Sequence, residues 1–359
     1  MGWSLGANDA ANIFGTAVGT KMVRFKTAAL ISGFFVIIGA VTGGAGTTET
    51  LGELGAVNAI AGSFMVAFSA GITVFWMTKL KLPVSTSQAI VGAIVGWNFY
   101  SGSATDYNTL IRIVLTWVLC PILAALFSLV LFYLLRMVLR KIRIHLLRLD
   151  LYTRIGLILV GSFGAYSLGA NNIANVMGVF VPIAIFSDVR ILSLFTLSHA
   201  QILFFIGGIA IAIGIYTYSK RVMETVGGSL LKLSPVVALV IVLSQALVLF
   251  LFASKGLESW LLSHGLPTFP LVPVSSSQAI IGAVVGIGLL KGGRGIRYKV
   301  LGGIASGWVT TPIIACIITF VSLFFLQNVF NQEVSKKADM QTQVYMEKVE
   351  IQNSELRIH

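Results

Sequence analysis

The sequence predicts an all-α polytopic membrane protein with about ten spans, arranged as two inverted-topology repeats. Of its 359 residues, 56% are hydrophobic and only 11% are Asp, Glu, Lys or Arg, which is about half the charge of an average soluble domain. Mean hydropathy is +0.91, and the apolar residues form long blocks dotted with glycine, as membrane helices tolerate. These observations exclude a water-soluble globule, and the chain has no room for a large soluble domain.

Ten apolar blocks can be delimited, and at about 20 residues per crossing plus short loops the length of the chain allows about ten spans. They cover approximately residues 1–20, 27–43, 58–78, 84–100, 109–138, 154–181, 191–217, 233–253, 274–290 and 299–327. We divide the chain into a first transmembrane repeat (1–138), a basic connector (139–153), a second, inverted repeat (154–327) and a polar C-terminal tail (328–359).

The net charge of +12 could suggest a nucleic-acid partner, but the basic residues lie between the apolar blocks. This is the positive-inside pattern of cytoplasmic loops, so we expect no nucleic acid as a partner and the lipid bilayer as the surroundings. The connector is the most basic loop and is placed in the cytoplasm. With five spans on each side of it, the two halves lie in opposite directions and both termini face outside. We expect the cell (plasma) membrane as the location.

Internal repeats support this division. Residues 5–12 (LGANDAAN) return as 168–175 (LGANNIAN), and residues 83–96 return as 273–286 with 11 of 14 positions identical. Two weaker echoes keep the same order: Glu-Thr-x-Gly at 49 and 224, and Trp-Val-x-x-Pro at 117 and 308. Only five residues precede the first GAND motif, so the first span is expected to be shortened.

The duplicated Asn motifs place polar residues in the middle of apolar stretches, where backbone breaks are tolerated only beside a cavity or inside the protein. We therefore expect broken or re-entrant helices at the motifs. Amide carbonyls, a carboxylate and freed backbone carbonyls are hard oxygen ligands that suit Na⁺ or a proton relay. The cation-binding candidates are Asn8, Asp9, Asn12, Asn171, Asn172 and Asn175. The alternative is polar contact between helices without a ligand.

The duplicated hydroxyl motifs, PVSTSQ and PVSSSQ, each place a proline and three hydroxyls before an apolar, glycine-spaced helix. Such a helix start offers free N–H donors, hydroxyl donors and the positive end of the helix dipole, which together can bind an anion. The alternative role is helix capping alone. The substrate-binding candidates are Ser85, Thr86, Ser87, Gln88, Ser275, Ser276, Ser277, Gln278 and Asp9.

Two further carboxylates, Glu49 and Glu224, occupy matched positions near span ends and are candidates for coupling or gating, although solvated loop carboxylates are an alternative. We see no nucleophile with a paired base, so an enzyme is not expected. The four histidines and two cysteines lack metal-ligand spacing, and no transition metal or other cofactor is expected. A nucleotide-binding Gly-rich motif is also missing, so transport would use an ion gradient.

Together, these paired motifs make the sequence resemble the inorganic phosphate transporter (PiT) family, from Gly6 to about Phe325. The resemblance implies an importer of inorganic phosphate coupled to Na⁺ or H⁺, with a homodimer as the assembly. Its site would combine the Asn motifs with the hydroxyl motifs. Two positions depart from the family pattern. Asn172 stands where Asp is frequent, which removes one potential charge, and Gln88 and Gln278 stand where His is frequent, which removes a proton-sensitive side chain.

Some relatives in this family carry sulfate, so the substrate needs a separate reason. Near neutral pH, phosphate still carries a proton to donate, whereas sulfate only accepts hydrogen bonds. Asp9 could accept that proton and would repel sulfate. We therefore favour a secondary active phosphate importer that works by alternating access, with Na⁺ more than H⁺ as coupling ion. A sulfate permease of the same fold and a passive anion channel are the alternatives.

Overall fold

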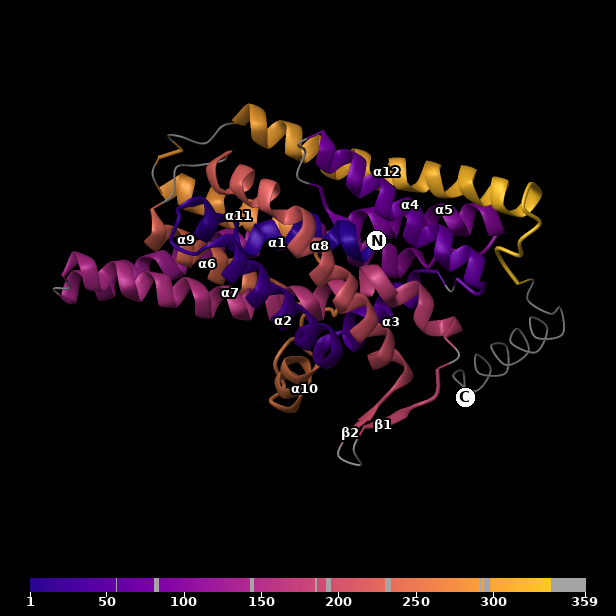
Figure 1. Cartoon of the computed structure of the whole chain (residues 1–359), viewed down its shortest axis with the longest axis horizontal. Helices are drawn as coiled ribbons and strands as arrows, with labels where there is room; N and C mark the ends of the chain where they lie inside the picture. The colour runs from indigo at the N-terminus through magenta and orange to yellow at the C-terminus, as the bar shows by residue number, and fades with distance from the viewer. Residues whose placement is uncertain are drawn as a thin grey trace, which may run out of the picture.

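The structure is a computed structural model that describes residues 1–336 except 56, 81–83, 143–144, 185, 192–194, 230–233, 291 and 294–297. Twelve α-helices dominate these residues (Figure 1). They are α1 (Gly2–Gly19), α2 (Phe25–Gly43), α3 (Ala45–Leu54), α4 (Ile60–Lys79), α5 (Thr86–Ser101), α6 (Tyr107–Lys141), α7 (Leu146–Met177), α8 (His199–Ser229), α9 (Pro235–Leu251), α10 (Lys255–Ser263), α11 (Ser276–Leu290) and α12 (Tyr298–Asn328). A 3-10 helix, η1 (Gly178–Ile183), follows α7.

The predicted helical membrane class is confirmed, since each of the ten apolar blocks contains a helix. By length and composition, five helices in the described residues could cross a membrane unaided: α2, α4, α6, the first 22 residues of α8, and α12. The pair α9 and α10 adds a sixth if this pair, bent by 70°, counts as one span. The helices that carry the paired motifs, α1, α5, α7 and α11, are more polar or shorter than these.

The expectation of helix breaks at the Asn motifs is wrong. Both motifs lie inside continuous helices, α1 and α7, because each Asn or Asp side chain finds its partners on neighbouring elements while the backbone keeps its helical hydrogen bonds. Chain breaks occur instead at the hydroxyl motifs. There α5 begins after the extended Ser85 and α11 begins at Ser276, and the two helices have only 16 and 15 residues. At 1.5 Å per residue they are about 24 Å long, shorter than the roughly 30 Å hydrocarbon core.

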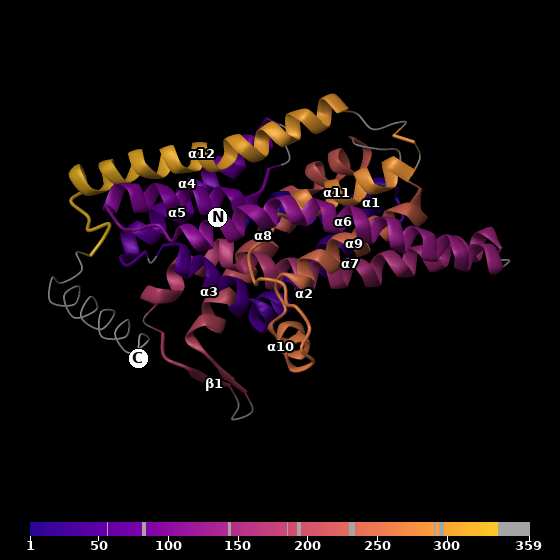
Figure 2. The same cartoon turned by 180° about the vertical axis from the view of Figure 1, so that it is seen from behind.

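Helices of the first half of the chain pack against helices of the second half. α1 packs on α8 and α7 on α2, while α5 packs on α12 and α11 on α6. Glycines allow these close approaches: a β-carbon added at Gly6 would lie 2.0 Å from the carbonyl oxygen of Ile211, and one at Gly169 would lie 2.1 Å from that of Val36. Every motif helix therefore packs closely against a helix of the opposite half. In Figure 2, α12 lies alongside α4 and α5 and extends beyond them.

Two segments differ from the sequence expectation. The basic connector is largely helical, since α6 runs to Lys141 and α7 starts at Leu146, and the two helices project together from the body (Figure 1). The seventh apolar block begins as a β-hairpin rather than a helix: β1 (Val189–Ile191) pairs antiparallel with β2 (Phe195–Leu197). β-Branched and aromatic residues in this stretch suit strands, and α8 starts only at His199.

The loop before α6 contains a conventional helix cap. Asp106 accepts a hydrogen bond from the backbone N–H of Asn108 (2.9 Å) and another from the Thr109 hydroxyl (2.6 Å). The hydroxyl bond from Thr109 is the main cause that holds the pKa of the exposed Asp106 carboxyl below its ordinary value. Asp106 therefore fixes the start of α6.

Candidate functional site

The first feature of the candidate site is that the two hydroxyl motifs face each other. The Ser87 hydroxyl donates to the carbonyl of Val274 (3.0 Å), and the Ser277 hydroxyl donates to the carbonyl of Val84 (3.1 Å). Each helix start thus reaches back to the segment that precedes the other. This reciprocal pair of bonds brings the N-terminal ends of α5 and α11 together, although the motifs are about 190 residues apart in sequence.

Each motif also caps its own helix. The hydroxyl oxygen of Ser85 accepts from the backbone N–H of Gln88, and that of Ser275 accepts from the backbone N–H of Gln278, both at 3.2 Å. The capping role considered for these motifs is therefore real for the first serine of each. The other hydroxyls of both motifs point elsewhere, so capping alone does not account for the motifs.

On one side of these helix ends, α1 supplies Asp9. Its carboxylate accepts from the Thr86 hydroxyl at 2.7 Å and from the Asn8 amide at 2.8 Å. One turn further along the same face, the Asn12 amide donates to the Ser276 hydroxyl at 3.0 Å. α1 therefore contacts both hydroxyl motifs, one through Asp9 and the other through Asn12.

On another side, α7 supplies Asn172 and Asn175. Oδ1 of Asn172, 3.2 Å from the Ser87 oxygen, is an alternative acceptor for the one hydroxyl hydrogen of Ser87. The Asn175 amide donates both to the Ser87 oxygen and to Oδ1 of Asn172, each at 2.9 Å. Ser87 is thus the junction between α5 and α7. The predicted cation and anion candidates do not form two separate groups, because each Asn motif is bonded directly to hydroxyl residues.

Asn171 has a different position from its neighbours. Its amide donates to the carbonyl of Val272 (3.1 Å), and its Oδ1 accepts from the backbone N–H of Val274 (2.8 Å). Asn8, its counterpart in the first half, donates in the same way to the carbonyl of Val84 (3.1 Å). These two asparagines hold the extended segments that lead into α11 and α5. Sequence reasoning missed this positioning role, since it depends on backbone groups at the start of the hydroxyl motifs, which are distant in sequence.

All fourteen predicted site residues in these four motifs are buried, and none is more than 3% exposed. Four of their polar atoms nevertheless lack a hydrogen-bond partner in the described structure: Oε1 of Gln88, Oε1 of Gln278, Nδ2 of Asn172 and Oδ1 of Asn175. An enclosed polar atom without a partner costs about 1–3 kcal/mol. Each such atom needs an explanation, and a bound ligand would supply one.

The charge of Asp9 supports the same interpretation. The ion pairs in the described part of the chain join Arg154 to Asp150 and Lys255 to Glu49, and Asp9 belongs to neither. A lone carboxylate at membrane depth costs roughly 2.5–3.5 kcal/mol even on lenient scales, so a mobile cation or proton near it would be stabilising. The oxygens of Asp9, Asn175 and the surrounding hydroxyls are ligands that suit Na⁺. The site therefore offers oxygen ligands to a cation and N–H and O–H groups to an anion.

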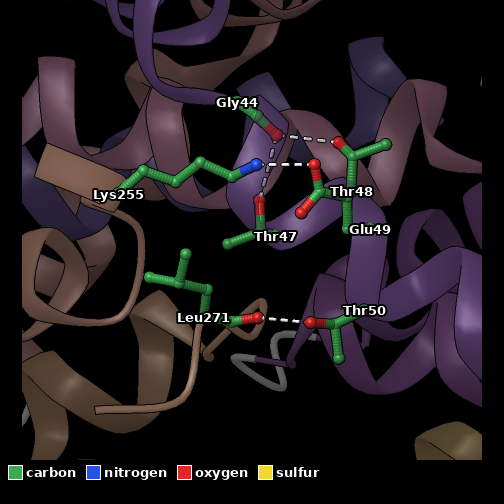
Figure 3. Close-up of polar contacts among 7 residues, drawn as sticks. All are labelled: Gly44, Thr47, Thr48, Glu49, Thr50, Lys255 and Leu271. Carbon is green, nitrogen blue, oxygen red and sulfur yellow. Dashed lines mark hydrogen bonds and ion pairs between the residues drawn. The ribbon is translucent and has the colours of Figure 1, made fainter. Parts of the chain in front are cut away.

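Of the two gating candidates, Glu49 lies outside this cluster. It sits on α3 and pairs with Nζ of Lys255 at the start of α10, 2.5 Å away (Figure 3). The next residue, Thr50, donates to the carbonyl of Leu271, which is three residues before Val274. α3 thus ties α10 and the segment before α11 together. Glu224 lies on α8, and its side chain is outside the described part of the structure.

The fold and the site together define a helical membrane protein with an enclosed polar centre built from two matched halves. The chain matches the phosphate transporter family over residues 5–149, 141–259 and 259–356. It belongs to this family, as the sequence resemblance predicted.

Individual relatives are consistent with this membership. The chain is 30% identical over 318 residues, 88% of its own length and 91% of the other, to a Methanocaldococcus jannaschii protein assigned as a phosphate permease. It is 29% identical over 336 residues to a sulfate permease of Bacillus subtilis, covering 89% and 84% of the two chains. A solved structure of a sodium-dependent phosphate transporter is similar with a TM-score of 0.69 at 23% identity, covering 91% and 96%. That last similarity concerns the fold.

Proposed function

We propose that this protein is a secondary active transporter that imports inorganic phosphate together with a cation, Na⁺ in preference to H⁺, by alternating access. The observation that carries the proposal is the position of Asp9, an enclosed carboxylate bonded to Thr86, beside two helix N-terminal ends that face each other. Helix ends and hydroxyls attract an oxyanion, while the carboxylate attracts a cation or the proton of phosphate.

In this proposal the two ligands stabilise each other. The anion would lie between Ser85, Thr86, Ser87 and Gln88 on one side and Ser275, Ser276, Ser277 and Gln278 on the other. The cation would be held by Asp9, Asn12, Asn172 and Asn175, with Asn8 and Asn171 positioning the two helix starts. The cation offsets the negative charge of the anion, so neither ligand binds well alone. This mutual dependence is the physical basis of coupling.

Alternating access would use the two matched halves. Residues 1–138 and 154–327 act as inverted repeats, joined by 139–153 and followed by the tail 328–359, and a movement of one repeat against the other would open the enclosed site to one side at a time. The close contacts between helices of opposite halves, α1 with α8 and α5 with α12, are the surfaces along which the repeats would shift. Glu49 and Glu224 would act at the ends of this movement, as gating residues.

The surroundings follow from the same proposal. The basic α6–α7 connection would lie in the cytoplasm and both termini outside a plasma membrane. The assembly would be a homodimer, as the family resemblance implies. Neither a cofactor nor a catalytic residue is part of the mechanism.

A sulfate permease is the second candidate, and one observation favours it. Asn172 offers an enclosed Nδ2 donor without a partner, at a position where a second carboxylate would otherwise repel sulfate. Sulfate is only an acceptor and would gain from such a donor. Against this, the Asp9 carboxylate has no proton to accept from sulfate, so phosphate is the better match for the complete site.

The proposal is tested by radiolabelled phosphate uptake into proteoliposomes under an inward Na⁺ gradient, an inward H⁺ gradient or neither, each with and without excess unlabelled sulfate. Uptake that depends on the Na⁺ gradient and resists sulfate is the expected result. Uptake driven by the H⁺ gradient would change the coupling ion. Uptake that sulfate blocks would favour the sulfate permease, and flux that ignores both cation gradients would identify a passive anion channel.

A further inference from the structure

The Trp-Val-x-x-Pro segments at Trp117 and Trp308 have no role in the site described above, yet they recur in both halves. Each lies on a long helix of one half that packs against the hydroxyl-motif helix of the other half, α6 against α11 and α12 against α5. The packing register decides what these tryptophans face.

The helices α5 and α12 run in the same direction in close contact. A β-carbon added at Gly92 would lie 2.1 Å from the Pro312 carbonyl oxygen, and one added at Gly96 would lie 2.5 Å from that of Cys316. A step of four residues on one helix thus matches a step of four on the other. Continued by one turn toward the start of both helices, this register matches Gln88 with Trp308.

The other pair of helices repeats this register. A β-carbon at Gly282 would lie 2.2 Å from the Pro121 carbonyl oxygen, and one at Gly286 would lie 2.7 Å from that of Ala125. Continued by one turn toward the start of both helices, it matches Gln278 with Trp117. The register therefore pairs a glutamine with a tryptophan twice, once beside each hydroxyl motif.

The polar atoms at both places are complementary and unused. Oε1 of Gln88 and Nε1 of Trp308 are enclosed without a hydrogen-bond partner, and so are Oε1 of Gln278 and Nε1 of Trp117. Each place has one acceptor and one donor. A local explanation for the glutamines fails, because in a Ser-x-x-Gln capping box the glutamine oxygen would accept from the backbone N–H of the capping serine, and neither oxygen does so here.

We infer that Trp308 and Trp117 are positioning residues for the anion site: when the oxyanion binds, the indole N–H of each tryptophan donates to the amide oxygen of the matched glutamine, a bond that is not formed in the described structure, and the amide N–H groups of Gln88 and Gln278 are then directed at the oxyanion. This inference rests on the proposed function. A glutamine amide can rotate to present either oxygen or nitrogen, and only the nitrogen attracts an anion. A donor that engages the oxygen selects the useful orientation and preorganises the site.

The pairing of glutamine with tryptophan also predicts how anion binding depends on pH. Neutral amide donors do not titrate near neutral pH, so the two glutamines would contribute the same attraction to an oxyanion across the physiological range. The tryptophans make no contact with the ligand in this scheme and act only through the glutamines. Loss of an indole N–H should therefore lower the affinity for the anion and leave the rate of the transport cycle unchanged.

The test is a set of Trp→Phe variants, which keep the aromatic packing and remove the N–H group. We expect Trp308→Phe and Trp117→Phe each to raise the KM for phosphate uptake about tenfold, the equivalent of one hydrogen bond to a charged ligand, with the maximal rate within about twofold of the wild type. Trp76→Phe is the matched control, because Trp76 is 58% exposed on α4. Wild-type KM values in both site variants would overturn the inference.

A double-mutant cycle separates positioning from general packing damage. In a Gln88→Leu background, Trp308→Phe should have no further effect, whereas Trp117→Phe should still raise KM, because its glutamine is intact. Equal further losses from both tryptophan changes would contradict the pairing. If phenylalanine disturbs folding, a benzothienylalanine replacement keeps the bicyclic shape without the N–H, and the same outcomes apply.

The failure of the proposed function would be visible elsewhere, in the wild type itself. A wild type that moves sulfate and not phosphate would refute the phosphate assignment, and the same cycle measured with sulfate would still decide whether the tryptophans position the glutamines. A wild type that neither binds nor moves a tetrahedral oxyanion would overturn both.

Discussion

At the scale of single residues, the side chains within each of the two matched Asn motifs make different contacts. Asn8 and Asn171 bind backbone groups and position the helix starts, whereas Asp9 and Asn175 bond the hydroxyls of Thr86 and Ser87. The single carboxylate makes the centre asymmetric, because Asp9 in the first half corresponds to Asn172 in the second. In the proposed mechanism, this asymmetry determines how many charges the bound cation and anion must balance.

Asn172→Asp is a direct test of that balance. A second carboxylate next to Ser87 and Asn175 would repel anions that carry no proton and would require a further cation. We expect phosphate uptake to depend more steeply on Na⁺ concentration, and sulfate to compete at least tenfold less well. Measurement of the Na⁺ dependence of uptake in wild type and variant decides this. An unchanged dependence would show that Asn172 does not face the ligands, and Asn98→Asp, on α5 outside the cluster, serves as a control for a buried charge elsewhere.

At the scale of helices, glycine at the crossing points fixes how the halves interlock. Gly92→Ala places a methyl group against the backbone of α12, where only 2.1 Å is available, so α5 and α12 must separate. Overpacking of this kind costs about 1–3 kcal/mol, and we expect a clearly lower thermal stability in detergent.

Gly303→Ala is the matched control for that variant. Gly303 is also inside a helix, α12, but a β-carbon there would have no atom within 4 Å. Alanine should be neutral or stabilise the protein by about 0.5–1 kcal/mol, since it favours the helix. Similar losses from both substitutions would mean that the effect comes from helix propensity and not from the crossing.

The contact between α3 and α10 is a second prediction at this scale. Glu49 and Lys255 are 66% and 45% exposed, and an exposed ion pair contributes only about 0.2–1 kcal/mol. We expect Lys255→Met to change the phosphate uptake rate by no more than about fivefold. In a charge exchange, Lys255→Glu should slow uptake further, and Glu49→Lys in the same chain should restore it. If the double variant remains as slow as Lys255→Glu, the pair does not act as a unit.

Much of the helical arrangement could be predicted, and the reasons for the exceptions are physical. The hydroxyl motifs predicted that helices begin there, as α5 and α11 do, because proline and hydroxyl residues are strong start signals. Continuous helices through the Asn motifs could not be predicted, since the partners of Asn8 and Asn171 are backbone groups of distant segments. The matching of Gln88 with Trp308 likewise depends on a helix register between halves, which no local pattern encodes. The hairpin at 189–197 was missed because its apolar residues fit a helix equally well.

At the scale of the whole molecule, the described structure encloses the fourteen site residues of the Asn and hydroxyl motifs. In the proposed mechanism this arrangement would be a closed intermediate of alternating access. A site that opens to one side at a time should be reachable from both sides of the membrane, but never from both at once.

This can be measured with a single reporter cysteine at Ser277 in a chain whose own cysteines, Cys120 and Cys316, are replaced by alanine. A membrane-impermeant thiol reagent should label it from outside in one set of ion conditions and from inside in another. Bound Na⁺ and phosphate together should slow labelling from both sides. Fast labelling from both sides under one condition would describe a channel and not a transporter.

The most direct test of the central claim is phosphate binding to the purified protein at increasing Na⁺ concentration, in wild type, Asp9→Asn and Asp106→Asn. Asp106 is the control, because it is an exposed carboxylate that only caps α6. We predict that Na⁺ strengthens phosphate binding in the wild type and in Asp106→Asn, and that Asp9→Asn loses this dependence while it remains folded. If Asp9→Asn binds phosphate with the same Na⁺ dependence as the wild type, Asp9 does not couple the two ligands and the account is wrong.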